Sequence, residues 1–419
     1  MAKKEFDEIA ELLMSKYNFN TPEDSEICYV FLNGYYVPAE IHIKKEIQAI
    51  MDESGDKLSV RFVREVIETI KRKSYDNVDQ NKNLISLKNG LFDIENYSLI
   101  PHNKDVFVTY QINANYDPNK KCPAIAKFLS EIVSIEDINT LIDIAAYCLF
   151  KSNLFKLFFI LYGDHDSGKS TYCNLLNTFL DQKNVSAIPI QELQQRFRST
   201  GLIDKLANIV ADLPSKAIKD TGKIKELTGN DLTGAEIKHG KSFQFTNTAK
   251  LIFSCNELPW ISPDTDDAFY ERVKFVRFPN TFNESTMDRE LDKKTTTDDE
   301  LSGFLNLVLN NLFEMVANKS FNARSSADEN RQIWERMMDG SSVTNFLNSS
   351  RVKRCQGWVD KKKFYQAYVA WCGNNDEIPV SESKVGREMR NRHNFTDYYP
   401  KSTTAAGRQV HAWKGISIL

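Results

Sequence analysis

The sequence predicts an α/β protein whose central sheet is preceded by a mixed α+β region and followed by a small basic region. Short apolar runs at 158–162, 206–211 and 251–255 alternate with helical segments, which is typical of an α/β sheet. Residues 83–100 alternate apolar and polar side chains around the turn pairs Asn-Gly and Glu-Asn, which favours short antiparallel strands. Residues 351–419 form the basic region.

The most informative segment is FFILYGDHDSGKST at 158–171. It opens with a continuous apolar run, as expected for a strand that is buried on both faces of a sheet. The spacing G-x-x-x-x-G-K-[ST] follows, in which glycines let backbone N–H groups point at phosphate oxygens. A helix predicted from Tyr172 to Leu180 comes next, and its N-terminal dipole favours a bound anion. The predicted phosphate-binding residues are Gly163, Gly168, Lys169, Ser170 and Thr171.

In a loop of this kind the lysine reaches the β- and γ-phosphates of a nucleoside triphosphate, and the next hydroxyl ligates Mg²⁺. Lys169 and Ser170 take these places in the chain. Asp164 and Asp166 stand in the loop where small residues are usual, so we expect their carboxylates to point away from the phosphates.

The composition is that of a soluble globular protein with two or three domains. The chain has 419 residues, of which 41% are hydrophobic and 26% are charged. We expect no membrane partner and a cytoplasmic location, since no apolar stretch could span a bilayer and MAKKEFDEIAELLM is typical of an amphipathic helix. The 7 cysteines contain no C-x-x-C pair, which favours a reducing compartment over a disulfide framework or a zinc site.

Three residues near later strands are candidate catalytic residues. Asp212 ends an apolar run and could hold Mg²⁺ through water, although aspartates also end ordinary strands. Asn256 follows the next apolar strand, where an amide can orient the attacking water or simply cap the strand. Arg272 could act as an arginine finger across a subunit boundary, but like Lys274 and Arg277 it could also be a surface charge.

Taken in order, these pieces resemble superfamily 3 helicases, and most closely the phage, plasmid and poxvirus-type primase-helicases. The resemblance is carried by the phosphate loop, Asp212, KELTGNDLTGAEIKHGKSFQF at 225–245, the Asn256 strand with its Leu-Pro, and Arg272. It covers residues 83–280 well, including NGLFDIENYSLIPHN at 89–103 and CPAIAKFL at 122–129, and the C-terminal region more loosely. It implies an AAA+-like P-loop NTPase core.

The resemblance further implies a ring-shaped homo-oligomer, usually a hexamer, that uses ATP and Mg²⁺ to move along single-stranded or forked DNA. Within it, Asp212 would handle Mg²⁺, Asn256 would act as a sensor and Arg272 would be supplied in trans. The family often joins this helicase to a primase or primase-polymerase, so a domain or protein of that kind is an expected partner. The basic residues at the place of the pore hairpin, which grips single-stranded DNA in the family, are Lys238, His239 and Lys241.

The chain departs from the family pattern beside the Mg²⁺ acid. Many members have a second carboxylate there that polarises water, whereas Ala211 precedes Asp212 and Leu213 follows it. The general base is therefore unassigned, and the possible stand-ins are Glu192, Glu226 and Glu236.

The basic region predicts a winged helix that contacts DNA, mainly through phosphates. Residues 351–419 hold 13 Lys/Arg and 6 Asp/Glu, a net charge of +7, which leaves −10 for the rest of the chain. KKKFYQAYVAWC at 361–372 predicts a helix with a buried aromatic face, and a hairpin is predicted near 398–413. Between them, a second helix at 381–395 carries Lys384, Arg387, Arg390 and Arg392 on its polar side. The alternative is a solvated helix on a packing domain.

We therefore expect three domains: an N-terminal α+β collar or accessory domain at 1–152, an ATPase domain at 153–339 and a winged helix at 340–419. The expected function is that of an ATP-dependent replicative DNA helicase of a phage, plasmid or virus. Two alternatives stay open, namely a DNA translocase that does not unwind and an ATP-switched replication initiator. A nucleotide kinase is disfavoured, because nothing indicates an acceptor pocket.

Overall fold

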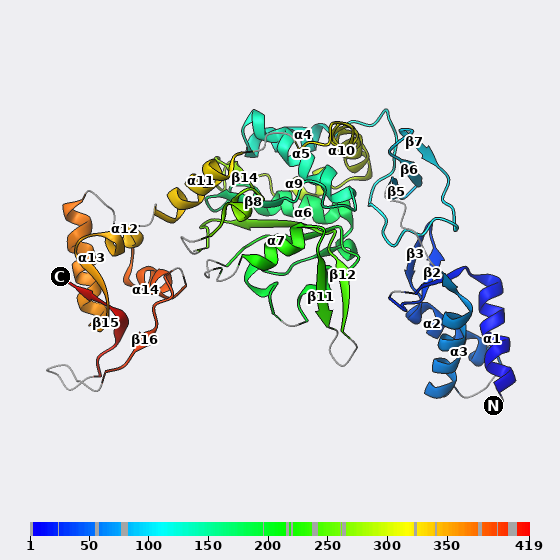
Figure 1. Cartoon of the computed structure of the whole chain (residues 1–419). Coiled ribbons are helices and arrows are strands. Elements are labelled where there is room, and N and C mark those ends of the chain that lie inside the picture. The colour runs from blue at the N-terminus through cyan, green and yellow to red at the C-terminus, as the bar shows by residue number, and fades with distance from the viewer. Residues whose placement is uncertain are drawn as a thin grey trace.

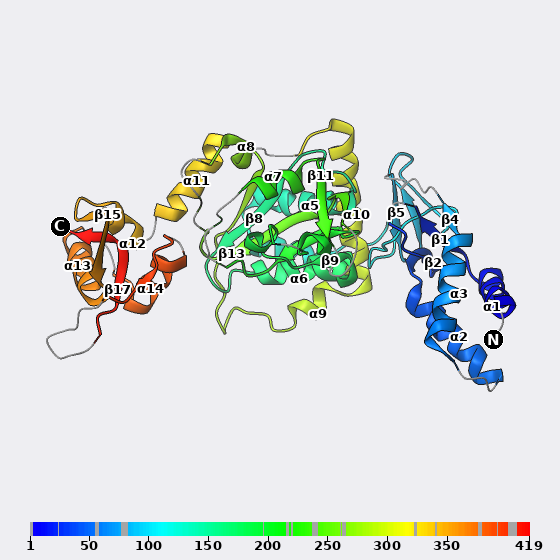
Figure 2. The same cartoon turned by 60° about the horizontal axis from the view of Figure 1, so that its bottom comes forward.

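The computed structural model describes residues 3–23, 25–54, 58–76, 83–195, 197–214, 218, 221–236, 242–259, 261, 265–321, 325–339, 342–375, 379–391, 393–400 and 409–419. N-terminal helices lie at one end of an elongated molecule, an α/β body lies in the middle, and a C-terminal module lies at the other end (Figure 1, Figure 2). Among these residues, no helix is long and apolar enough to cross a membrane.

The N-terminal region is a four-stranded sheet with three helices. Its strand order is β3-β2-β1-β4, and Ala10, Ile43 and Val66 from the three helices meet in one core. The aromatic segment at 28–38 forms the hairpin β2–β3. The elements are α1 (Lys3–Lys16), β1 (Phe19–Pro22), β2 (Tyr29–Leu32), β3 (Tyr35–Pro38), α2 (Glu40–Ser54), α3 (Val60–Lys73) and β4 (Tyr75–Asp76).

A small antiparallel sheet and two helices connect this region to the central body. The sheet comprises β5 (Leu84–Leu87), β6 (Gly90–Asp93) and β7 (Ser98–Ile100), as the alternation at 83–100 predicted. Helices α4 (Pro123–Ile132), α5 (Ile135–Leu149) and α10 (Asp298–Asn318) share one hydrophobic core with the helix of the phosphate loop. This core includes residues on both sides of the predicted domain boundary at 152, so that boundary stays a prediction.

The central body is a five-stranded parallel sheet with the order β14-β8-β13-β10-β9. All residues of β13 are buried, as expected for a strand that is covered on both faces. The apolar runs at 158–162, 206–211 and 251–255 fall on three of these strands, which confirms the predicted α/β sheet. The strands are β8 (Phe158–Gly163), β9 (Val185–Ser186), β10 (Ala207–Val210), β13 (Lys250–Cys255) and β14 (Val273–Phe278).

Helices and one hairpin surround this sheet (Figure 1). The hairpin pairs β11 (Leu232–Glu236) with β12 (Ser242–Thr246) and extends away from the sheet. Short 3-10 helices cover Gln182–Asn184, Ile190–Glu192 and Ser199–Leu202. The α-helices are α6 (Lys169–Leu180), α7 (Gly222–Thr228), α8 (Asp267–Tyr270), α9 (Leu291–Thr295) and α11 (Ala327–Asp339).

The C-terminal module contains the predicted pair of helices and a three-stranded sheet of order β15-β17-β16. Phe364 and Tyr368 are fully buried, so the aromatic face of the first predicted helix is core. The helix α12 and the strand β15 were not predicted, and the name winged helix stays a prediction. The elements are α12 (Ser342–Asn348), β15 (Val352–Asp360), α13 (Lys361–Asn374), α14 (Glu382–Asn391), β16 (Asp397–Tyr398) and β17 (Ala412–Ile418).

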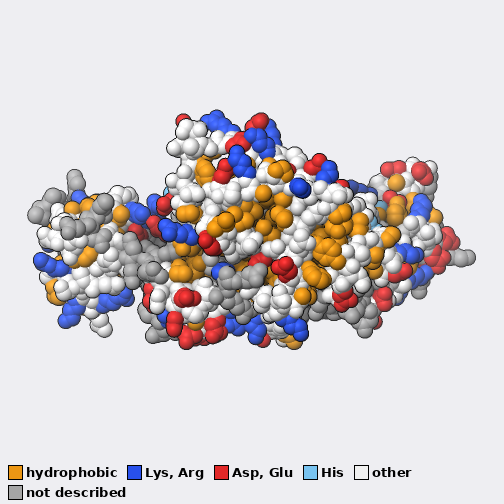
Figure 3. Space-filling view, turned by 90° about the horizontal axis from the view of Figure 1, so that it is seen from above, with side chains coloured by type: hydrophobic (Ala, Val, Ile, Leu, Met, Phe, Trp, Pro, Cys, Tyr) orange, Lys and Arg blue, Asp and Glu red, His pale blue; other side chains and the backbone are white. Residues whose placement is uncertain are grey.

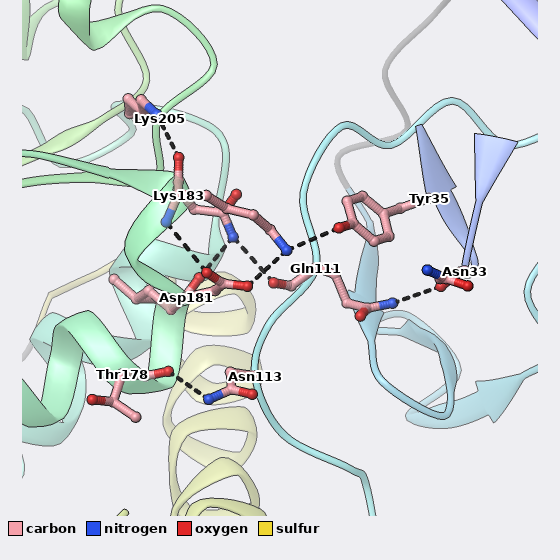
Figure 4. A network of polar contacts seen from close by, with 10 residues as sticks. Asn33, Tyr35, Gln111, Asn113, Thr178, Asp181, Lys183 and Lys205 are labelled. Carbon is pink, nitrogen blue, oxygen red and sulfur yellow. Dashed lines mark hydrogen bonds and ion pairs between the residues drawn. The ribbon is translucent and has the colours of Figure 1, made fainter. Parts of the chain in front are cut away.

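A polar network joins the N-terminal region to the far end of α6 (Figure 4). Lys183 Nζ donates to the hydroxyl of Tyr35 in β3 at 2.9 Å and pairs with Asp181 at 2.7 Å. Asn113 donates to the carbonyl of Thr178, in the last turn of α6, at 3.0 Å. The β2–β3 hairpin is thus held against the end of the helix whose start follows the phosphate loop.

Candidate functional site

Two glycines let the loop between β8 and α6 lie close to its neighbours. Gly168 has a φ of 89°, and a Cβ there would lie 2.4 Å from Cγ2 of Ile132 in α4. At Gly163 a Cβ would lie 2.3 Å from the carbonyl oxygen of Phe278 in β14. Neither position has room for a side chain, so packing by itself requires a glycine at both positions of the motif.

Lys169 is buried at the first position of α6. Its Nζ donates to the carbonyls of Gly163 at 2.9 Å and Asp164 at 2.6 Å, and to the hydroxyl of Ser167 at 2.9 Å. Burial lowers the pKa of Lys169, while nearby Cys255 and the Asp164 carboxyl act in the opposite direction. Because its direct partners are neutral oxygens, the ammonium group can exchange them for phosphate oxygens, which bind it more strongly.

A pocket of about 690 Å³ lies at the N-terminus of α6. Its volume suits a nucleotide, since small-molecule sites typically measure about 300–1,000 Å³. The pocket brings the phosphate loop together with two of the three candidate catalytic residues. The sequence-predicted residues that line it are Gly168, Lys169, Ser170, Thr171, Asp212 and Asn256.

Asp212 and Asn256 meet beside the loop because they follow neighbouring parallel strands. β10 pairs with β13 and β13 pairs with β8, so the three carboxyl ends lie at one edge of the sheet. The backbone N–H of Leu213 donates to the carbonyl of Ser254 at 2.7 Å and fixes the segment after β10. Asn256 Nδ2 lies 3.2 Å from Nδ1 of His165, which links the predicted sensor to the loop.

The oxygen donors at this edge fit Mg²⁺. Ser170 and Asp212 are both exposed and line the same pocket. Mg²⁺ usually takes one or two protein oxygens and completes its shell with water and phosphate, so one hydroxyl and one carboxylate suffice. Within the described part of the chain, no group of three or more His, Cys, Asp or Glu could hold a metal by itself.

Arg272 lies at the opposite edge of the sheet. β14 is parallel to β8 and its last residue, Phe278, pairs with Gly163, so Arg272, which precedes β14, is at the far end from the phosphate loop. Its Nη1 donates to the carbonyl of Ala268 at 2.5 Å, and its buried Nε has no hydrogen-bond partner among the described residues. Arg272 therefore does not reach the pocket of its own chain, and its role in trans stays a prediction.

The suggested stand-ins for the general base lie away from the pocket or outside the described side chains. Glu192 pairs with Arg198 at 2.9 Å, and Glu226 pairs with Lys223 at 2.9 Å. Neither carboxylate is among the residues that line the pocket. The side chain of Glu236 lies outside the described residues. The general base therefore remains unassigned.

The pocket wall also contains charged residues that sequence reasoning missed. α4 contributes Lys127 and Glu131, which lie 3.7 Å apart, and the segment after β14 contributes Asp288, Asp292 and Lys294. No motif marks these positions, since packing alone brings them to the loop. The sequence feature that could have pointed to α4 is that the family resemblance includes residues 122–129.

The predicted pore hairpin corresponds to β11 and β12, which pair from Leu232 with Thr246 to Glu236 with Ser242. Its predicted DNA-gripping residues, Lys238, His239 and Lys241, lie outside the described residues. The antiparallel hairpin itself agrees with what the resemblance implies, whereas the DNA contact stays a prediction.

The predicted DNA-binding residues of α14 lie in different surroundings. Arg387 is exposed, and Arg390 forms an ion pair with Asp397 at 3.5 Å. Lys384 Nζ pairs with Glu257 at 3.0 Å, so this candidate DNA contact touches the residue that follows Asn256. Arg392 lies outside the described residues.

Two family models match the chain. A model described as "D5 N terminal like" matches residues 5–134. A model described as "Family of unknown function (DUF5906)" matches residues 161–272, a range that begins within β8 and ends at Arg272.

Curated relatives of the chain are viral proteins. "Putative helicase 121R" of Invertebrate iridescent virus 3 is 25% identical over 224 residues, which cover 49% of this chain and 24% of that protein. "Putative helicase L207/L206" of Acanthamoeba polyphaga mimivirus is 26% identical over 218 residues, which cover 49% of this chain and 23% of that protein. The chain thus spans about a quarter of the length of the relatives it matches.

One solved structure that aligns with the chain is "The apo structure of NrS-1 C terminal region (305-718)". The alignment has 11% sequence identity and a TM-score of 0.49, and it covers 99% of this chain and 100% of that chain. The chain carries a D5 N terminal like region and a DUF5906 region and is similar, at low identity, to viral putative helicases, which is consistent with the phage and viral primase-helicase family that its motifs resemble.

Proposed function

We propose that this chain is the motor of an ATP-dependent DNA helicase of the superfamily 3 type, which serves the replication of a phage, plasmid or virus. The observation that carries the proposal is the pocket that brings Lys169, Asp212 and Asn256 to the start of α6. The viral relatives, whose names read "putative helicase", favour a DNA motor over other enzymes with a phosphate loop.

In this proposal the triphosphate of ATP takes the place of the neutral partners of Lys169. The free N–H groups and the dipole of α6 attract the same negative charge. Ser170 and Asp212 would hold Mg²⁺, which when bound neutralises charge on the phosphates. Asn256 would orient the attacking water, in contact with His165 of the loop. Positioning and charge neutralisation then account for most of the acceleration of phosphoryl transfer.

The motor would work as a homo-oligomeric ring, with Arg272 acting in the pocket of the adjacent subunit. Lys238, His239 and Lys241, which lie in sequence between β11 and β12, would contact single-stranded DNA in the pore. The C-terminal module would contact DNA as a winged helix, and a primase or primase-polymerase would act beside the motor.

A second candidate function is an ATP-switched DNA-binding protein that does not turn over. It is favoured by the position of Glu192 and Glu226, which are held in ion pairs away from the pocket. Without a general base, ATP would act as an assembly signal rather than as a fuel.

The deciding experiment measures ATP hydrolysis and strand separation on forked DNA for the wild type, Lys169→Ala and Lys293→Ala. Lys293 is a matched control, because it is 82% exposed and only one residue from the pocket residue Lys294. We expect Lys169→Ala to lose about 100-fold or more in both rates, because it removes the cation at the phosphates, and Lys293→Ala to retain both.

Hydrolysis stimulated by single-stranded DNA without strand separation would instead indicate a translocase. Tight ATP binding by the wild type with no hydrolysis on any DNA would contradict the motor and leave the ATP-switched protein.

A further inference from the structure

The outer face of the C-terminal sheet carries exposed aromatic side chains. Trp358 in β15 is 42% exposed, and its ring centroid lies 6.3 Å from that of Tyr398 in β16. Lys414 in β17 is exposed, and its Nζ lies 5.7 Å from the centroid of the Tyr398 ring. Trp358, Tyr398 and Lys414 are called the aromatic platform below.

Strand register places these three residues on one face. Trp358 pairs with Lys414 and Tyr398 pairs with Ala412, and residues two apart in a strand share a face. Ala412, which pairs with both Tyr398 and Asp360, is fully buried. Trp413 points to the other face, where it is 2% exposed and belongs to the core of the module.

A break in the register separates the platform from the core. The pairing of β15 with β17 shifts between Arg354 and Trp358, and Gly415 opposite this break has a φ of 93°. Beyond the break, Ile416 is fully buried in the core of the module. A bulge of this kind changes the direction in which side chains point. The backbone therefore turns Trp358 towards solvent, and its exposure is not a gap in the packing of the core.

A second pair of aromatic rings follows the platform residue Tyr398 in sequence. Tyr399 follows Tyr398 and is 52% exposed, and its ring centroid lies 5.0 Å from that of His411. Burying large aromatic side chains is strongly favourable, so a group of them left in water typically marks a contact surface.

Positive charge is present on both faces of this sheet. The module carries a net charge of +7. Lys361 and Arg390 lie over the ring of Trp413, at 4.2 Å and 5.7 Å from its centroid, on the other face of the sheet. Both also pair with Asp397, which partly neutralises them, whereas Lys414 is exposed beside the rings. Exposed aromatic rings with a lysine beside them are complementary to a nucleic acid, which is a polyanion with flat bases.

We propose that the aromatic platform binds single-stranded nucleic acid, with unpaired bases stacked on Trp358 and Tyr398 and the backbone near Lys414. Stacking of this kind tolerates any base, because every base has a π face, but it needs bases that are not paired. The site is separate from the polar face of α14, and it does not depend on ATP hydrolysis.

The test measures binding of the nucleotide-free full chain by fluorescence anisotropy to three labelled ligands. These are a single strand, an abasic strand of the same length and the matched duplex. The variants are Trp358→Ala, Trp358→Phe and Lys362→Ala, the last an exposed basic residue of α13 that serves as the charge control. Thermal unfolding of each variant checks that the module is folded.

We expect Trp358→Ala to weaken binding of the single strand by about tenfold and to leave the abasic strand and the duplex unchanged. Trp358→Phe should restore most of the loss, because it keeps a ring. Lys362→Ala should weaken all three ligands alike and lower their salt dependence.

Three results would overturn the proposal. Trp358→Ala could bind the single strand as the wild type does, or it could weaken all three ligands equally. It could also change the oligomeric state in size-exclusion chromatography with DNA affinity intact, which would make the surface a contact between copies of the chain. None of these readouts involves ATP turnover, so they are independent of the proposed motor.

Discussion

At the scale of single residues, Lys250 is a basic side chain buried at the start of β13. It is 1% exposed, and its Nζ lies 4.4 Å from the centroid of the Tyr147 ring. Mainly through burial, the pKa of Lys250 is lowered from 10.5 to about 7; Cys148 acts in the opposite direction, and Lys151 acts in the same direction as burial. Between pH 7 and about 10.4, the unfolded chain therefore holds a proton that the folded chain lacks, so stability rises with pH across this interval.

We predict that Lys250→Met stabilises the protein at pH 7, where the buried lysine still carries part of its charge. The gain in Tm should shrink as pH rises towards 10, because the wild type recovers the stability that protonation removes. Thermal unfolding of both proteins at several pH values between 7 and 10 measures this effect, with the exposed Lys293→Met as the control. A Lys250→Met variant that is less stable at every pH would show that the contact with Tyr147 outweighs the cost of burial.

At the scale of elements, the sequence predicted those whose pattern is local. The central strands are continuous apolar runs, and α13 and α14 show helical spacing of apolar residues. These strands and helices could therefore be predicted directly from the sequence. β15 was missed because it is a largely exposed strand rich in polar residues, in which Val359 alone is buried. The contribution of α4 to the pocket was missed because the contact of Ile132 with Gly168 depends on packing between segments that are distant in sequence.

The close packing of the loop between β8 and α6 predicts that Gly168 does not tolerate substitution. A Cβ at this position would meet Ile132 Cγ2 at 2.4 Å, and the φ of 89° disfavours any L side chain. Gly168→Ala should therefore destabilise the fold by about 1–3 kcal/mol and abolish binding of a fluorescent ATP analogue.

Gly373→Ala provides the matched control for this glycine. A Cβ at Gly373 in α13 would meet no atom within 4 Å, so the substitution should stabilise its helix by about 0.5–1 kcal/mol. Urea unfolding measures both changes. Equal effects of the two substitutions would contradict the assigned role of the Gly168 backbone.

At the scale of the whole molecule, two features bear on self-association. Arg272 lies at the sheet edge opposite the pocket, as a residue that serves a neighbouring subunit would. Hydrophobic side chains gather near the middle of the face seen from above (Figure 3). On the helices at the top of Figure 1, Ile135 of α5 is 78% exposed and Phe313 of α10 is 44% exposed. Exposed apolar surface of this kind is commonly covered in an assembly.

If Arg272 acts in trans, two inactive variants should complement each other. Lys169→Ala lacks a working loop and Arg272→Ala lacks the finger, so each alone should be inactive. In mixed assemblies, about a quarter of the interfaces would join an intact loop to an intact arginine. Titration of one variant into the other, with ATP hydrolysis as the readout, measures this recovery. No recovery, in assemblies shown by mass photometry to be mixed, would contradict the proposed action of Arg272 in trans.

The ion pair between Lys384 and Glu257 has a thermodynamic consequence. A DNA phosphate would compete with Glu257 for Lys384, and Glu257 is joined by the backbone to Asn256 at the pocket. A strand that takes Lys384 from Glu257 would therefore alter the surroundings of the predicted sensor. By linkage, nucleotide and strand would change each other's affinity by the same factor. The exchange of this single ion pair would thus couple nucleotide binding to DNA binding within one subunit.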